Sequence, residues 1–104
     1  MQADYIYIHN FLSLPEFPEG YFESKTDLIL DLFKCYLPNF IIYPQVNIKN
    51  LGAHISWNFS LKSPGGNRGY CYAYYWLLSK RLEFYYVIDK EKVEVDSLFL
   101  DNDL

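Results

Sequence analysis

The chain has 104 residues, 51% of them hydrophobic and 21% charged, with a net charge of −4. This size and balance indicate one soluble domain and exclude a membrane-spanning chain, because no apolar run approaches the roughly 20 residues that cross a bilayer. The aromatic share of 20% is high. It predicts either a thin core filled with large rings or a sheet face whose rings stay exposed for binding.

Charges are segregated along the chain. Residues 32–82 contain no Asp or Glu but six Lys or Arg, whereas both flanking segments are acidic. Such blocks can create surfaces of opposite sign on one small domain, and the alternative is that folding interleaves them. The two cysteines, Cys35 and Cys71, are expected to be reduced, buried thiols. Because the start of the chain lacks the features of a secretory signal, we expect a cytoplasmic protein.

The first elements in chain order are a β-prone run at residues 5–8 and an extended connection at 10–20, whose prolines oppose a helix. Four residues of this connection are expected to cover part of the core, with an exposed hydrophobic docking arm as the alternative: Phe11, Leu12, Leu14 and Phe17. One helix is predicted over about residues 24–37, with Ser24 as its cap and Pro38 ending it. Five residues follow the spacing of one helical face and form the predicted buried stripe: Leu28, Ile29, Leu32, Phe33 and Tyr36.

Alternating apolar and polar residues after the helix predict a series of strands. Pro44 lies inside the first of them, which indicates an edge strand or a bulge, because proline cannot donate to a ladder. The four-residue acidic end, 101–104, is expected to fray. The predicted strands occupy residues 40–48, 54–61, 70–78 and 82–88, with a short last strand at 93–96.

These elements predict a single α+β domain spanning residues 1–104, in the order β-α-β-β-β-β(-β). One helix packs on a curved antiparallel sheet of five to six strands. Because one helix covers only part of one sheet face, the other face must be wet, covered by the 10–20 connection, or buried against another molecule.

The segment 69–88 forms the centre of the predicted sheet and holds six of the eleven tyrosines. Alternation places Tyr70, Tyr72, Tyr74 and Trp76 on one face and the residues between them on the other. Periodicity alone does not identify the outward face. A binding surface would therefore be centred on these four residues, or on Tyr75 and Tyr85 if the opposite parity faces outward.

The expected function is stoichiometric binding of another protein, by a small intracellular inhibitor of the toxin-immunity or phage anti-defence type that covers its partner's working surface. No enzymatic activity and no cofactor are expected. The acidic segments suit a basic partner, such as a nuclease or other nucleic-acid-handling machine. We expect an acidic rim around the tyrosines, with Glu94 and Asp96 sharing a strand face. The rim residues are Asp89, Glu91, Glu94 and Asp96.

The alternative function is binding of a nucleotide or single-stranded nucleic acid through the basic aromatic segment 62–86, where cations track phosphates and rings stack on bases. The glycine-rich loop at 62–69 lacks the phosphate-loop pattern and precedes a strand instead of a helix. A homodimer that buries the exposed sheet face is the third hypothesis. The anion-binding candidates are Lys62, Arg68, Lys80 and Arg81.

Metal and nucleophile chemistry find little support in the sequence. The two histidines and two cysteines are far apart and form no paired ligand motif, so no metal site is expected. Cys71 could be activated by His54 if adjacent strands brought them together. Cys71 shares its parity with Ala73 and Leu77, however, which indicates a packed thiol.

Overall fold

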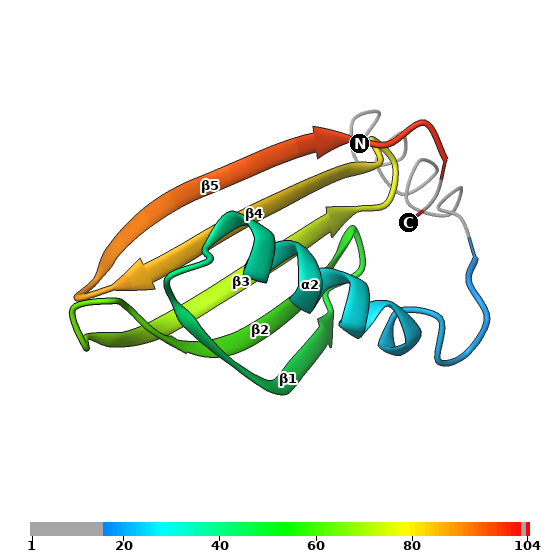
Figure 1. Cartoon of the computed structure of the whole chain (residues 1–104). Coiled ribbons are helices and arrows are strands. Elements are labelled where there is room, and N and C mark those ends of the chain that lie inside the picture. Colours follow the sequence, from blue (N-terminus) through cyan, green and yellow to red (C-terminus); the bar gives the residue numbers. More distant parts are fainter. Residues whose placement is uncertain (1–15, 103) are drawn as a thin grey trace.

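A computed structural model describes residues 16–102 and 104 of the chain, and it shows one helix packed on a five-stranded sheet (Figure 1). The α+β prediction is confirmed. The predicted strand at 5–8 and most of the 10–20 connection lie outside the described residues. The elements are η1 Glu23–Lys25, α2 Thr26–Tyr36, β1 Ile41–Asn50, β2 His54–Lys62, β3 Arg68–Trp76, β4 Arg81–Ile88 and β5 Glu91–Phe99.

The sheet is an antiparallel meander in which spatial order follows chain order, β1-β2-β3-β4-β5. Each strand therefore pairs only with its neighbours in the sequence. One consequence is that the charge blocks stay apart within the sheet. Strands β1 to β3 carry Lys49, Lys62 and Arg68 and no carboxylate, whereas every carboxylate of the sheet lies on β4 or β5.

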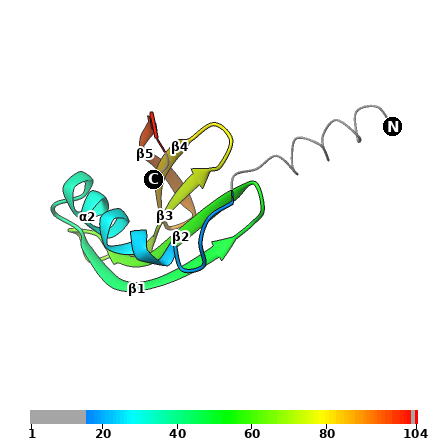
Figure 2. The same ribbon diagram turned by 90° about the vertical axis from the view of Figure 1, so that its right-hand side faces the viewer.

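The core lies between α2 and one face of the sheet, which curves around the helix (Figure 2). The ring of Phe33 meets Phe59 and Phe84 edge-on, with centroids 6.0 and 5.2 Å apart. Trp57 and Tyr75 in the same layer are fully buried, and the Trp57 indole donates to the Phe22 carbonyl at 3.2 Å. Phe17 packs against this core, as predicted.

The helix differs from the prediction at its start and in its buried stripe. A 3-10 turn precedes α2, whose N-cap is Lys25 with no side-chain cap. Ser24 instead donates to the Tyr21 carbonyl, so its predicted capping role is wrong. Leu28 is 46% exposed and Leu30 is buried in its place, whereas the other four residues of the predicted stripe lie in the core or pack against it.

The expectation that both cysteines are buried is wrong for Cys35. Cys35 lies on the exposed side of α2, whereas Cys71 is buried in the core, and both thiols are free.

Pro44 lies on an edge strand and also within a bulge, so both readings of this proline are confirmed. Ile42 pairs with Leu61 and Val46 pairs with Phe59, so β1 uses two more residues than β2 between these two pairs. The intervening residues Tyr43, Pro44 and Gln45 are all exposed. The bulge thus bows this edge of the sheet away from β2.

The last strand is longer than the predicted 93–96, because β5 runs from Glu91 to Phe99. Charged residues at its start hid the pattern, and a register shift opposite Phe84 and Tyr85 interrupts its alternation. Leu98 packs on the core, but Phe99 is 72% exposed. The Tyr21 hydroxyl donates to the Leu104 carbonyl, and fraying of residues 101–104 stays a prediction.

Replacing Gly69 should destabilise the fold strongly. A Cβ added there would lie 2.0 Å from the Val87 carbonyl oxygen, so β3 and β4 must separate to admit it. We expect Gly69→Ala to lower the free energy of unfolding by about 2 kcal/mol or more, measured by urea denaturation. Gly65→Ala is the control, since its Cβ would meet only the Ser63 hydroxyl at 3.8 Å. Equal effects of the two substitutions would contradict the close approach.

Lys90→Gly should stabilise the protein. Asp89 and Lys90 form a two-residue turn between paired Ile88 and Glu91, with φ of 51° and 66°, the type I′ geometry that favours glycine. Glycine adopts the left-handed conformation without strain, and this gain outweighs the added freedom of the unfolded chain. We therefore expect the free energy of unfolding to rise by about 0.5 kcal/mol, measured by thermal or urea denaturation. Lys90→Ala removes the same charge without relieving the backbone and should give no gain; an equal gain from alanine would refute this explanation.

Candidate functional site

The sheet face turned away from α2, called the open face below, carries alternate residues of every strand. Strand β3 contributes the four aromatic residues of one parity, and its neighbours contribute small polar groups on one side and charged groups on the other. The open-face residues are Asn47 and Lys49 of β1, His54, Ser56, Asn58 and Ser60 of β2, Tyr70, Tyr72, Tyr74 and Trp76 of β3, Arg81, Glu83, Tyr85 and Val87 of β4, and Lys92, Glu94, Ser97 and Phe99 of β5.

The structure identifies the outward parity of β3. Tyr70 is 52% exposed, whereas Tyr75 is fully buried in the core. Tyr85 lies on the open face because it pairs directly with Tyr72. The expectation that Tyr75 and Tyr85 share a face is therefore wrong, and Tyr85 joins the tyrosines of β3 instead.

Rings on the open face contact one another across three strands. The rings of Tyr72 and Tyr74 are nearly parallel, with centroids 6.0 Å apart. The centroids of the Tyr74 and Tyr85 rings are 5.8 Å apart. The ring centroid of His54, on β2, lies 4.3 Å from that of Trp76. The same histidine ring meets Tyr74 edge-on, with centroids 5.2 Å apart. These contacts restrict the rotamers that each ring can adopt.

A buried carboxylate lies beneath these rings. Glu83 is only 7% exposed. It accepts hydrogen bonds from the Trp76 indole and from the Tyr85 hydroxyl, the latter at 2.7 Å. The Arg81 guanidinium lies 3.1 Å from the carboxylate and donates through Nε to the Ser97 hydroxyl at 2.9 Å. Charged and neutral donors thus satisfy the carboxylate and fix two of the open-face rings.

The ionisation of these groups reflects their contacts. Burial alone would raise the pKa of Glu83, but hydrogen bonds from Tyr85 and Trp76 and the charge of Arg81 lower that pKa below its ordinary value. The hydrogen bond to Glu83, with burial, raises the pKa of Tyr85 to about 12. Burial also raises the pKa of Tyr74, with smaller contributions from Tyr72 and Glu83.

The four expected rim acids do not form one rim. Glu94 pairs with Tyr85 on the open face, whereas Asp96 pairs with Phe84 on the helix side. There Asp96 accepts a hydrogen bond from Tyr36, and burial together with this bond raises the pKa of Tyr36 to about 12. The register shift between Glu94 and Asp96 turns them to opposite faces, so the expectation that they share one is wrong.

The other two acids, Asp89 and Glu91, lie at the turn between β4 and β5 and are exposed. Only Glu94 of the four is therefore adjacent to the tyrosines. The Tyr85 ring also contacts a cation. The Nζ of Lys92 lies 4.2 Å from the centroid of this ring, which is a favourable cation–π arrangement.

The four candidate anion-binding cations separate into two pairs at opposite ends of β3. Lys62 and Arg68 pair across β2 and β3, whereas Lys80 lies in the turn before β4 and Arg81 pairs with Trp76. Strand β3 has nine residues, so the pairs are roughly 25 Å apart at about 3.3 Å per residue. Since Arg81 is also bound to Glu83, the four cations do not form a single site.

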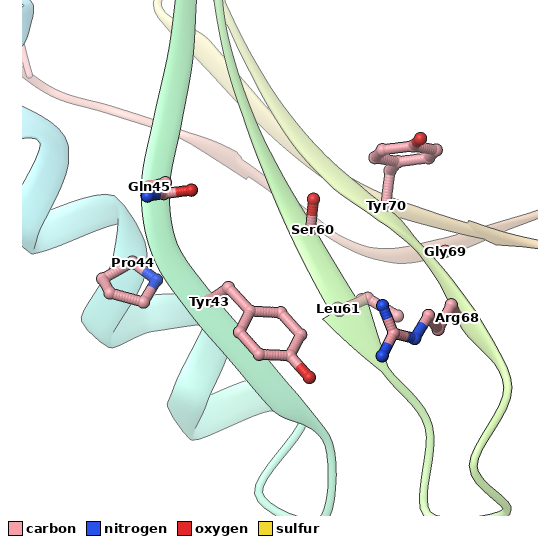
Figure 3. A pocket seen from close by; sticks show the side chains of 8 residues that line it. All are labelled: Tyr43, Pro44, Gln45, Ser60, Leu61, Arg68, Gly69 and Tyr70. Atoms are coloured by element: carbon pink, nitrogen blue, oxygen red, sulfur yellow. The ribbon is translucent and has the colours of Figure 1, made fainter.

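A pocket of about 580 Å³ opens beside the bulge of β1 (Figure 3). Sequence reasoning missed it, although Pro44 marked the bulge that creates it. Its floor is at the end of β2, and Tyr43 and Arg68 extend toward one another from the flanking strands β1 and β3 (Figure 3). The lining residues are Tyr43, Pro44, Gln45, Ser60, Leu61, Arg68, Gly69 and Tyr70.

Cys71 and His54 are not brought together. Cys71 faces the core and pairs with Phe59, while His54 lies on the open face opposite Trp76. Burial raises the pKa of the Cys71 thiol to about 12, so the thiolate form is disfavoured. Among the described residues no three His, Cys, Asp or Glu side chains cluster as metal ligands would, and no helix of the described chain is long and apolar enough to cross a bilayer.

Comparison of the chain with family models, curated proteins and solved structures found no match. The site is therefore interpreted from its own geometry.

Neutralising Glu83 should destabilise the protein in a pH-dependent way. A carboxyl whose folded pKa is depressed stabilises the fold above its ordinary pKa and loses that contribution as the pH falls through the folded pKa. At pH 7 we expect Glu83→Gln to lower the free energy of unfolding by about 1–3 kcal/mol. The difference from the wild type should shrink as the pH falls below 4.5, the ordinary value.

Denaturant unfolding at several pH values would measure this difference. Glu94→Gln is the matched control, because Glu94 is an exposed carboxylate on the same face and should change stability by less than about 0.5 kcal/mol at any of these pH values. A Glu83→Gln effect that is independent of pH would contradict the assignment of Glu83 as the charged anchor.

Proposed function

We propose that this protein binds another protein stoichiometrically through its open face and inhibits that partner by covering its working surface. The centre of the interface consists of Tyr70, Tyr72, Tyr74, Trp76 and Tyr85. The mechanism requires only recognition and occlusion, so it needs no catalytic group and no cofactor.

The observation that carries the proposal is the fixed ring cluster over Glu83. Trp76 and Tyr85 are hydrogen-bonded to this carboxylate, and His54 and Tyr74 pack against them. Side chains that are already ordered lose little conformational entropy when a partner covers them. Aromatic residues held in this way are typical of the side chains that contribute most to protein interfaces.

The residues beside the rings support the same function. Asn58 and Ser60 of β2 lie next to the tyrosines of β3 on the open face and are accessible to a partner, whereas Ser56 is buried. Tyrosine supplies rigid amphipathic contact area, while serine and asparagine supply adaptable hydrogen bonds, a combination typical of protein-binding loops in antibodies. The face is thus suited to a polar protein surface.

The proposed partner is basic. Glu94 borders Tyr85 on the open face, and Asp89 and Glu91 are exposed at the turn between β4 and β5, where Lys90 and Lys92 alternate with them. A basic surface would pair with these carboxylates. Inhibition of a nuclease or a similar nucleic-acid-handling enzyme, as in toxin immunity or phage anti-defence, fits this chemistry. The proposal includes a cytoplasmic location, which the two free cysteines support.

Affinity capture from a nuclease-treated lysate of the native host tests the proposal. We expect the wild-type chain to retain one protein in stoichiometric yield. Tyr72→Ala combined with Tyr74→Ala should abolish retention, because each interface tyrosine can contribute about 2 kcal/mol. Leu28→Ser is the matched control, since Leu28 is exposed on α2 outside the open face, and this variant should retain the partner.

Circular dichroism must show that all three chains are folded. Equal retention by all three would refute binding through the open face. Capture that disappears after nuclease treatment would indicate nucleic acid in place of a protein partner. A wild-type mass that doubles with concentration, but not in the tyrosine variant, would show that the open face is occupied by a second copy of the chain.

A further inference from the structure

The pocket beside the β1 bulge is a separate feature from the ring cluster. It lies at the β1 edge of the sheet, whereas the Glu83 cluster lies over β3 and β4. Its volume of about 580 Å³ is within the range of small-molecule sites. A smaller hollow of about 250 Å³ adjoins it and shares Gln45, Ser60 and Tyr70 with it, adding the amides of Asn47 and Asn58.

The polar groups of this pocket favour an anion. Arg68 is its one cation, no carboxylate lines it, and Arg68 makes no ion pair with another described residue. Lys62 pairs with Arg68 across the adjacent strands and adds a second positive charge at this end of the sheet. The nearest acid by register is Asp89, which follows Ile88, the partner of Gly69, and it lies outside the lining.

The remaining lining favours a planar ring. Tyr43 from β1 and Tyr70 from β3 stand on either side of the end of β2, with the Ser60 hydroxyl between these strands (Figure 3). Both tyrosines are exposed, so their ring faces are accessible for stacking. Aromatic side chains stack on nucleobases of any sequence, and an arginine guanidinium binds a phosphate through two parallel hydrogen bonds.

We propose that this pocket binds a nucleotide unit, with the phosphate on Arg68 and the base against the ring of Tyr70. Ser60 and the amides of Gln45 and Asn58 supply hydrogen bonds for the sugar and the base edge. A free mononucleotide and one nucleotide of a single strand share this chemistry. The proposal does not rest on binding of a protein partner, because Tyr43, Gln45 and Arg68 lie outside the proposed interface, although Tyr70, Ser60 and Asn58 are shared with it.

Titration of the full ¹⁵N-labelled chain with AMP, followed by two-dimensional NMR, tests the site. We expect saturable shifts centred on the amides of Ser60, Arg68, Gly69 and Tyr70, with a dissociation constant of about 1 mM or tighter. Adenosine and ribose 5-phosphate, which each lack one half of the ligand, should bind more weakly than AMP. No saturable shift at these residues up to about 5 mM AMP would overturn the proposal.

Three variants locate the site. Arg68→Gln should weaken AMP binding at least about tenfold, the usual loss when a hydrogen bond to a charged group is removed. Tyr70→Leu should weaken the binding of AMP but leave the affinity for ribose 5-phosphate unchanged, since only the base stacks on the tyrosine ring. Lys49→Gln is the matched control, because Lys49 is an exposed open-face cation outside the lining. An equal loss in Lys49→Gln would show diffuse charge attraction and overturn the site.

A short oligothymidylate distinguishes the two sources of the ligand. If it binds more than about tenfold tighter than the mononucleotide at physiological salt, with a loss in Arg68→Gln, the site serves single-stranded nucleic acid. If the two affinities are equal, the site serves a free nucleotide. Either result supports nucleotide binding in the pocket. An oligomer that binds without shifting the signals of the pocket residues contradicts this proposal.

Discussion

The buried carboxylate of Glu83 is the interaction on which the open face depends. A five-stranded sheet with one helix buries one of its faces and leaves the other uncovered, so rings on the uncovered face need partners other than a core. Glu83 supplies them by accepting from Trp76 and Tyr85 while Arg81 balances its charge. A buried charge is tolerated only when it is paired and hydrogen-bonded, and here the groups that satisfy it are the ones a binding surface would present.

The meander gives the sheet two chemically different halves. Because strand order follows chain order, the acid-free segment of the sequence becomes β1 to β3, and the acidic end becomes β4 and β5. The pocket at the β1 bulge lies in the basic half and the Glu83 cluster in the other. The proposed protein-binding face and the proposed nucleotide pocket thus follow from one topology, with Tyr70 at the boundary between them.

The sequence predicts the elements well because their periodicities are local. The helix, four of the strands and the bulge at Pro44 all follow from alternation, helical spacing and one proline. It does not predict which parity of β3 faces outward, since the position of α2 relative to the sheet decides that. Nor does it predict the Glu83 network or the separation of Glu94 from Asp96, because both depend on the register between β4 and its neighbours, which no local pattern specifies. The pocket was missed for the same reason, since it needs the register of β1 against β2.

The central claim is that Glu83 holds the open-face rings in one arrangement, and hydrogen exchange of the two indole N–H groups tests it within one molecule. Trp57 donates to the Phe22 carbonyl and Trp76 to the Glu83 carboxylate, so both should exchange slowly at neutral pH. Acidification through the pKa of Glu83 should release Trp76 and leave Trp57 protected, provided that the fold persists at that pH. A Trp76 indole that exchanges at neutral pH as fast as an exposed one, while Trp57 stays protected, would contradict the claim.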